Sequence, residues 1–204
     1  MDSAVEEQAT ARIHRVTALH PVHEPAGAFD RGRAERAVAE LLAAFGRDPS
    51  GPHLTETPRR VVDAFAERLT PKPFRATTFP NDEGYDELVL VRDIPFGSLC
   101  EHHLLPFRGV AHVGYLPGDR LIGLSKLARI VDAVSRDLQV QERMTMQIAE
   151  RLERELRPRG VGVVLRAEHT CMTTRGALAT GALTTTSRFT GALTDDERLR
   201  SRFD

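Results

Sequence analysis

Apolar residues recur at the helical period in two stretches near the beginning of the chain, residues 33–45 and 57–69. Gly46 follows the first stretch and favours a helix end there, because glycine tolerates the left-handed conformation that commonly closes a helix. Thr57 followed by Pro58 is typical of a helix start, with a capping side chain and a proline in the first turn. The pattern therefore predicts two helices ahead of the rest of the chain.

The remainder of the chain shows both the alternation typical of strands and the longer period typical of helices. In order, it predicts two strands, two helices and two strands, at residues 88–94, 109–116, 124–134, 144–156, 161–171 and 183–190. Because no linker or repeat divides this part, we expect an α+β domain with a helix pair packed on a four-stranded antiparallel sheet. We expect this domain at residues 86–204, an N-terminal helical extension at 30–85, and a disordered tail without apolar period at 1–29.

Composition and charge describe an ordinary globular chain. Its 204 residues are 41% hydrophobic, and 28 basic against 29 acidic residues leave a formal net charge of -1. This balance excludes the global basic field that drives binding to nucleic acids, so an anionic ligand must be held by local contacts. The first thirty residues contain no apolar stretch long enough for a signal peptide or a membrane span, and we expect a cytoplasmic protein.

Both cysteines of the chain lie beside histidines. Residues 100–103 read Cys-Glu-His-His, and residues 169–171 read His-Thr-Cys, a spacing that puts the last histidine and cysteine on one face of the predicted strand. In a reducing cytoplasm, a lone pair such as Cys100 and Cys171 is more often metal-binding or catalytic than joined in a disulfide. The two clusters therefore indicate a metal site.

Zinc suits this mixture of thiolates and imidazoles, although the same ligands could hold iron. If Cys100, His103 and Cys171 bind the ion, a position remains open for water. His102 and His169 are then left as imidazoles for proton transfer near neutral pH, which is a catalytic arrangement. One alternative is a closed structural site with His102 or His169 as the fourth ligand. Another is that His169 simply packs in the core.

The pattern of zinc-dependent nucleobase deaminases, H-x-E followed by P-C-x-x-C, is absent from the chain. Glu101 therefore has no role as the general acid of such an enzyme. We expect it to face solvent or to fix a neighbouring imidazole through a hydrogen bond.

Polar residues at predicted helix starts are candidates for holding an anion and a base. Ser125, Lys126 and Arg129 lie at the start of the third predicted helix, where backbone amides also favour an anion. Arg175 follows the second cysteine by four residues and could reach a phosphate near the metal. Glu142 opens the next helix, where it could accept hydrogen bonds from a purine. Each also has an ordinary alternative, as a solvated charge or a residue favoured by the helix dipole.

Four segments taken together resemble GTP cyclohydrolase I, and the match spans about residues 55–200. They are CEHHLLPF at 100–107, GLSKLARIVD at 123–132, QVQER at 139–143 and EHTC at 168–171. The resemblance implies a tunnelling-type fold with Cys100, His103 and Cys171 as the ligands of a Zn²⁺ cofactor. These are the same three ligands that leave two histidines free.

The resemblance also implies that the substrate is GTP. It implies acid–base roles for His102 and His169. The guanine would be contacted by Gln141 and Glu142. The triphosphate or ribose would be contacted by Lys126, Arg129, Arg175, Arg60 and Ser125. The implied reaction is attack of zinc-activated water at C8, opening of the imidazole ring, release of formate and closure to 7,8-dihydroneopterin triphosphate. Family members form toroidal decamers with sites between subunits, which suits a sheet with open strand edges.

Two positions depart from the family pattern. Asp63 stands three residues after Arg60, where relatives often carry a basic residue, and this affects the triphosphate end of the site. Thr174 and Ala177 flank Arg175 where larger apolar residues are common. Two rival functions remain at this point, an inactive zinc-stabilised scaffold of the same fold and a paralogue that serves a deazapurine pathway.

Overall fold

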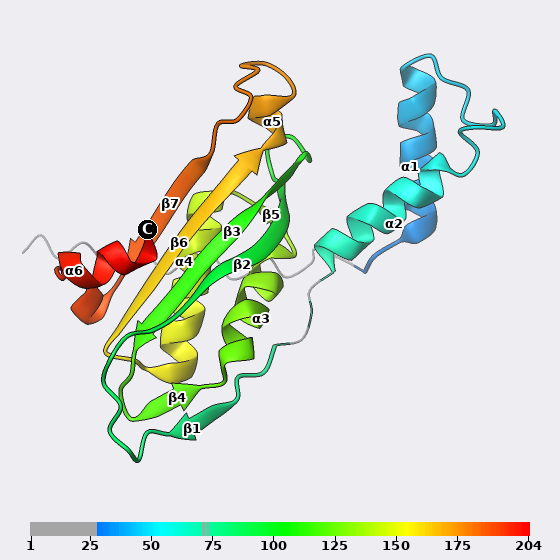
Figure 1. The fold of residues 1–204 in the computed structure, drawn as a ribbon. Helices are drawn as coiled ribbons and strands as arrows, with labels where there is room; N and C mark the ends of the chain where they lie inside the picture. The colour runs from blue at the N-terminus through cyan, green and yellow to red at the C-terminus, as the bar shows by residue number, and fades with distance from the viewer. Residues whose placement is uncertain (1–27, 71, 73) are drawn as a thin grey trace, which may run out of the picture.

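The computed structural model describes residues 28–204 except residues 71 and 73, so the tail predicted for residues 1–29 lies almost wholly outside the described residues. The helices are α1 (Arg31–Ala44), α2 (Thr57–Leu69), α3 (Leu124–Ser135), α4 (Gln141–Leu156), α5 (Thr170–Thr173) and α6 (Glu197–Arg200), with short 3-10 turns at Gly191–Leu193 and Ser201–Phe203 (Figure 1). The strands are β1 (Thr78–Pro80), β2 (Val89–Cys100), β3 (Pro106–Leu116), β4 (Arg120–Ile122), β5 (Leu138–Gln139), β6 (Gly160–His169) and β7 (Thr184–Phe189).

The main sheet has the strand order β5-β2-β3-β6-β7. Its four long strands pair antiparallel, which confirms the predicted α+β class and the predicted four-stranded antiparallel sheet. The sequence did not predict β5, which pairs parallel with the end of β2, or the separate two-stranded sheet formed by β1 and β4. These strands are two or three residues long, too short to show an alternation of polar and apolar positions.

The core lies between one face of this sheet and the two long helices α3 and α4, which Figure 1 shows side by side on that face. Alternate residues of the central strands, such as Ala111, Val113 and Leu165, point into it and are fully buried. Ile130 of α3 and Ile148 of α4 meet them from the helices. Because burial of each large aliphatic side chain contributes about 1.5–3 kcal/mol, this layer contributes strongly to the stability of the domain.

The C-terminal segment covers part of the opposite face of the sheet. Leu193 and Phe203 pack there against Leu116 and Val164 in a second, smaller core. A Cβ added at Gly162 would lie 2.4 Å from the Phe203 ring, so the absence of a side chain at this strand position makes room for the ring. The last residues of the chain are therefore part of the folded domain.

A buried histidine marks an irregularity in β2. The pairing register of β2 with β3 shifts between Val91 and Ile94, and Asp93 within this bulge has a φ of 56°. The backbone N–H of Asp93 donates to Nδ1 of His112 over 3.2 Å, and His112 is only 2% exposed. Burial lowers the pKa of His112, with smaller contributions in the same direction from Arg92 and Arg166 and an opposing one from the Asp93 carboxylate. The folded protein therefore holds this imidazole neutral.

This burial predicts a pH dependence of stability. Below the ordinary pKa of 6.5, His112 of the unfolded chain takes up a proton that the folded protein does not accept until a lower pH. Stability should therefore fall as the pH drops below about 6.5. His112→Asn keeps an acceptor oxygen for the Asp93 amide but cannot titrate. We expect its melting temperature to change less between pH 7 and pH 5 than that of the wild type, and equal slopes would contradict the assignment.

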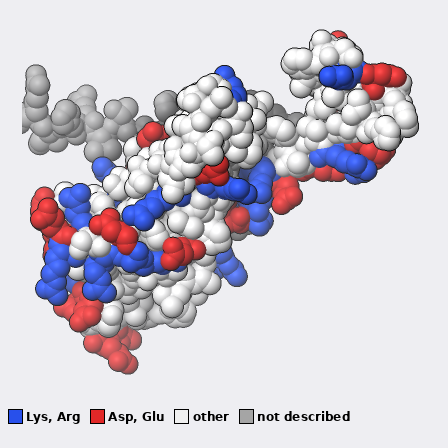
Figure 2. Space-filling view, turned by 45° about the horizontal axis from the view of Figure 1, so that its top comes forward, with Lys and Arg blue, Asp and Glu red and all other residues white. Residues whose placement is uncertain are grey.

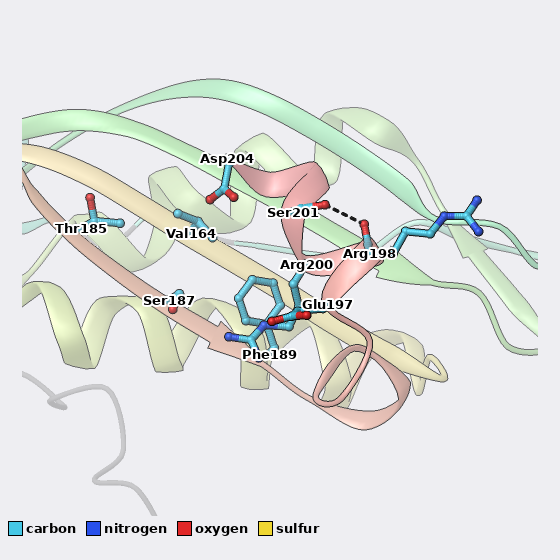
Figure 3. Close-up of a pocket in the computed structure, with 9 residues that line it drawn as sticks. All are labelled: Val164, Thr185, Ser187, Phe189, Glu197, Arg198, Arg200, Ser201 and Asp204. Atoms are coloured by element: carbon cyan, nitrogen blue, oxygen red, sulfur yellow. Dashed lines mark hydrogen bonds between the residues drawn. The ribbon is translucent and has the colours of Figure 1, made fainter.

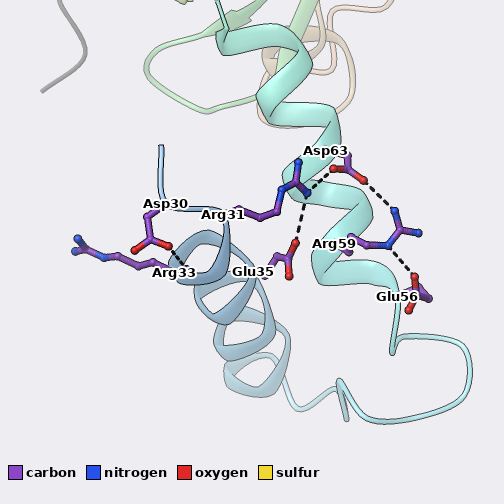
Figure 4. Close-up of polar contacts among 7 residues, drawn as sticks. All are labelled: Asp30, Arg31, Arg33, Glu35, Glu56, Arg59 and Asp63. Carbon is purple, nitrogen blue, oxygen red and sulfur yellow. Dashed lines mark hydrogen bonds and ion pairs between the residues drawn. The ribbon is translucent and has the colours of Figure 1, made fainter. Parts of the chain in front are cut away.

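The helices α1 and α2 form an arm that stands to one side of the sheet (Figure 1). Asp63, the departure noted in the sequence, joins the two helices: its carboxylate accepts from Arg31 of α1 over 2.6 Å and from Arg59 of α2 over 3.0 Å (Figure 4). The arginines hold the pKa of this carboxyl below its usual range, chiefly through the hydrogen bond from Arg31. Asp63 therefore has a local role within the arm.

The helix starts in the arm differ from the sequence prediction. α1 begins at Arg31, two residues before the predicted start, because the Asp30 carboxylate accepts from the backbone N–H of Arg33 over 2.9 Å and caps the helix. α2 begins at Thr57 as predicted, but the cap position is Glu56 and no side chain caps the helix there. The prediction that Thr57 caps α2 was wrong.

Candidate functional site

The first half of the candidate site is the end of β2 and the turn after it. β2 extends to Cys100, beyond the predicted end at residue 94, so Cys100 lies on the strand and not in the loop. The turn closes tightly, since the backbone N–H of Leu104 donates to the carbonyl of Cys100 over 2.8 Å and Leu104 has a positive φ of 55°. Cys100 is buried, whereas His102 and His103 in the turn are exposed.

The second half comes from the end of β6. The sequence placed His169 and Cys171 on one face of a strand, but β6 ends at His169 and Cys171 lies in the short helix α5. The strand interpretation of Cys171 was wrong, because the apolar alternation cannot show where a strand turns into a helix. The Thr170 hydroxyl donates to the carbonyl of Pro106 over 2.6 Å, which ties α5 to the start of β3, next to the turn.

The two halves bring three possible metal ligands together. One ligand atom from each of Cys100, His103 and Cys171 lies within 4.8 Å of the other two, and Sγ of Cys100 is 3.6 Å from Nδ1 of His103. We call these residues the cysteine–histidine cluster. The pKa of Cys171 is raised by burial and by the nearby Cys100. Two thiols and one imidazole at this separation fit zinc, whose positive charge would stabilise both thiolates. In the described residues, neither His102 nor His169 belongs to this group.

His169 lies beside the cluster in a defined orientation. Its ring stacks on Phe107 with 4.5 Å between the ring centroids and an angle of 4° between the planes. Its Nε2 is 2.8 Å from Oε1 of Gln141. Burial lowers the pKa of His169, and the carboxylate of Glu142 partly opposes this effect. His169 is thus partly buried and hydrogen-bonded, and is not simply a core residue.

Gln141 determines the tautomer of His169. Its Nε2 donates to two backbone carbonyls, of Leu165 over 3.1 Å and of Thr184 over 3.0 Å, so its Oε1 must face the imidazole. Oε1 can only accept, and His169 therefore carries its proton on Nε2 and leaves the lone pair on Nδ1. Gln141 is 1% exposed, so its side chain contacts protein groups in this chain. The sequence did not predict this contact with His169.

The candidate anion contacts are spread over three parts of the chain. Ser125 and Arg129 lie exposed at the start of α3, and the Lys126 ammonium donates to the backbone carbonyl of Arg75 over 2.8 Å. Arg175 follows α5 and is close enough to the cluster to lower the pKa of Cys171 slightly. Arg60 is exposed on α2, in the arm. The structure thus brings Arg175 near the cluster.

A hollow of about 640 Å³ lies elsewhere, between β7 and the C-terminal segment (Figure 3). Hydroxyls such as Ser187 line it, and so do charged side chains of both signs, including Glu197 and Arg198. Arg200 lies over the ring of Phe189, 4.9 Å from its centroid. No cysteine or histidine lines this hollow, so it is separate from the cysteine–histidine cluster.

The surface charges agree with the balanced composition. Figure 2 shows basic and acidic side chains interspersed over the face that it presents. Because charges of both signs are interspersed, an anionic ligand would depend on individual side chains such as Arg175.

In the part of the chain that the structure describes, no helix has the length and apolar character needed to cross a bilayer.

Comparisons with known proteins agree with the resemblance seen in the sequence. The family model of GTP cyclohydrolase I matches residues 34–204. GTP cyclohydrolase 1 of Mycobacteroides abscessus is 50% identical over 192 residues, which cover 91% of this chain and 93% of that protein. GTP cyclohydrolase 1 of Streptomyces griseus is 54% identical over 176 residues, covering 83% and 87% of the two chains. The enzyme of the same name from Thermobifida fusca is 50% identical over 182 residues, covering 87% of each.

Proposed function

This chain belongs to the GTP cyclohydrolase I family, and from that premise we propose that it opens the guanine imidazole ring of GTP to give 7,8-dihydroneopterin triphosphate and formate. One observation supports the proposal at the level of individual residues. The cysteine–histidine cluster contains three possible ligands, and two further histidines lie beside it in the chain. A set of three protein ligands leaves a coordination position open, as catalytic zinc sites require.

Cys100, His103 and Cys171 are the proposed zinc ligands. When bound, zinc acts as a Lewis acid that makes water a nucleophile at neutral pH, which is the chemistry needed for attack at a purine carbon. Cys100 at the end of a strand and Cys171 in a helix are held by backbone hydrogen bonds, which limits the movement of the two sulfur atoms. His103 lies in the exposed turn and completes the set.

His102 and His169 are the proposed acid–base pair. Ring opening, loss of formate and ring closure all need protons to be delivered and removed, and imidazoles exchange protons near neutral pH. His169 presents its Nδ1 lone pair, because Gln141 fixes the proton on Nε2. His102 is exposed in the turn after Cys100 and can approach a bound ligand from the solvent side.

The proposed substrate contacts place the base near His169. The Glu142 carboxylate is exposed and close enough to His169 to affect its pKa, so it can accept hydrogen bonds from the amide and amino groups of guanine there. Gln141, named with it from the resemblance, contributes by orienting His169. The triphosphate contacts proposed for Ser125, Lys126, Arg129, Arg175 and Arg60 come from separate elements of the chain.

This separation supports a site shared between subunits, and we propose a decamer of two pentamers. The sheet ends in open strand edges, and the arm bears an apolar cavity of about 470 Å³ lined by residues of α1 and α2 and by Leu104 from the metal-binding turn. Leu41 of α1 and Phe45, which directly follows this helix, are exposed. A second copy of this chain could cover these surfaces. Light scattering should give about ten times the mass of one chain, and a stable monomer would contradict the proposal.

The enzyme assay tests the function directly. Purified protein loaded with zinc is incubated with GTP, with and without a chelator, and formate and the fluorescent oxidised pterin are measured. We expect both products only in the sample without chelator. If neither sample forms these products, although zinc is bound in the sample without chelator, the chain is a zinc-stabilised scaffold of the same fold.

A further inference from the structure

A salt bridge joins the metal-binding turn to the start of α4. Nη2 of Arg143 is 2.5 Å from Oε2 of Glu101, and the two side chains are only 24% and 29% exposed. The two residues are 42 positions apart in the sequence. A partly buried pair with a short contact is held more firmly than an ordinary surface pair, because solvent competes with it less.

Arg143 is itself anchored on several sides. The same Nη2 also donates to the backbone carbonyl of Leu138 over 2.6 Å, and Nε donates to Oε1 of Gln139 over 3.1 Å. Gln139 is 2% exposed, and its Nε2 donates to the carbonyl of Val134. The guanidinium thus connects the exposed turn to a fixed, buried amide between α3 and α4.

Glu101 connects this anchor to His102. Its Oε1 lies 3.5 Å from Nε2 of His102, whereas its Oε2 is the oxygen paired with Arg143. Its backbone N–H donates to the carbonyl of Gln139 over 3.1 Å, so the main chain of Glu101 is tied directly to β5 and its side chain is tied to β5 through Arg143. The His102 side chain is 65% exposed, and packing alone restrains it little.

We propose that Glu101 and Arg143 are positioning residues for His102. Arg143 fixes the carboxylate, and the carboxylate holds the imidazole in one rotamer, with its ring centroid 6.3 Å from that of His103. Correct orientation of a proton-transfer group contributes directly to the rate, since the group must lie within hydrogen-bond reach of the reacting atoms. The inference rests on the proposed function, in which His102 moves protons during GTP hydrolysis.

Glu101→Gln tests the inference because glutamine has nearly the same shape as glutamate but no charge. Arg143→Lys keeps the positive charge but loses the several N–H donors of the planar guanidinium. Glu155→Gln is the matched control, because Glu155 pairs with Arg151 on the same helix α4 over 3.2 Å with the same 29% exposure. All variants are studied as the zinc-loaded full chain. The readouts are kcat and KM for GTP, zinc content, melting temperature and the visible spectrum of the cobalt-substituted protein.

We expect Glu101→Gln to lower kcat by about 10- to 100-fold, as is typical for partners that orient functional groups, with KM nearly unchanged. Zinc content, cobalt spectrum and melting temperature should match those of Glu155→Gln. Arg143→Lys should retain an intermediate kcat. A Glu101→Gln kcat equal to that of the control overturns the inference, and so does a parallel loss of zinc or stability in both variants. If Glu101→Gln does not fold, the inference is tested with Arg143→Lys alone, and a wild-type kcat for that variant overturns the inference. If the wild type itself does not convert GTP, the proposed function fails first.

Discussion

Cys171→Ser is expected to remove zinc from the protein and to reduce GTP turnover by more than about a thousandfold, because activation of water at neutral pH depends on the metal. Serine is nearly the same size as cysteine but is a poor zinc ligand, since its hydroxyl does not ionise at neutral pH. Cys171 is one of the three proposed ligands in the cluster, and we expect the two remaining ligands to hold the ion only weakly.

Zinc content per chain and formate release are the measurements for this variant. Thr174→Ser is a suitable control, because Thr174 directly follows the same short helix and its hydroxyl donates to the backbone carbonyl of Thr170, a contact that serine can keep. We expect this control to retain zinc and activity. A Cys171→Ser protein with a full complement of zinc would show that Cys171 is not a ligand.

Replacement of His169 or His102 by alanine is expected to lower turnover by about a hundredfold to ten-thousandfold, the usual contribution of general acid–base catalysis. The metal should stay in place, because neither imidazole belongs to the cysteine–histidine cluster. Loss of turnover with retained zinc therefore separates the acid–base role from the closed structural site, in which one of these histidines would be the fourth ligand.

Formate release and zinc content are again measured together for both variants. His53→Ala serves as the control, since His53 is an exposed histidine in the arm between α1 and α2. If zinc is lost from either alanine variant, that histidine is a ligand and the three-ligand assignment is wrong. For His169, the stacking on Phe107 adds a packing contribution, so the melting temperature is recorded as well.

The structure extends the sequence prediction mainly where side chains meet across long distances in the chain. Gln141 was named from the resemblance as a base contact, and the structure shows that its side chain is buried and that its Oε1 lies 2.8 Å from Nε2 of His169. One sequence signal pointed to this: Gln141 lies one helical turn before Met144 and Thr145, on the buried stripe of α4. The link from Arg143 to Glu101 had no such signal, because neither residue breaks the pattern of its own segment.

The sequence by itself predicted the four long helices, the four long strands, the residues of the cysteine–histidine cluster and the family, because these depend on local periodicity, residue chemistry and extended motifs. The end of β2 at Cys100, the helical position of Cys171 and the pairing of Asp63 with Arg31 were decided only by the tertiary structure. The physical reason is that a hydrogen bond or ion pair between distant segments depends on where the folded backbone brings them. The local sequence pattern reflects the structural preference of each segment alone and does not indicate which distant segments come into contact.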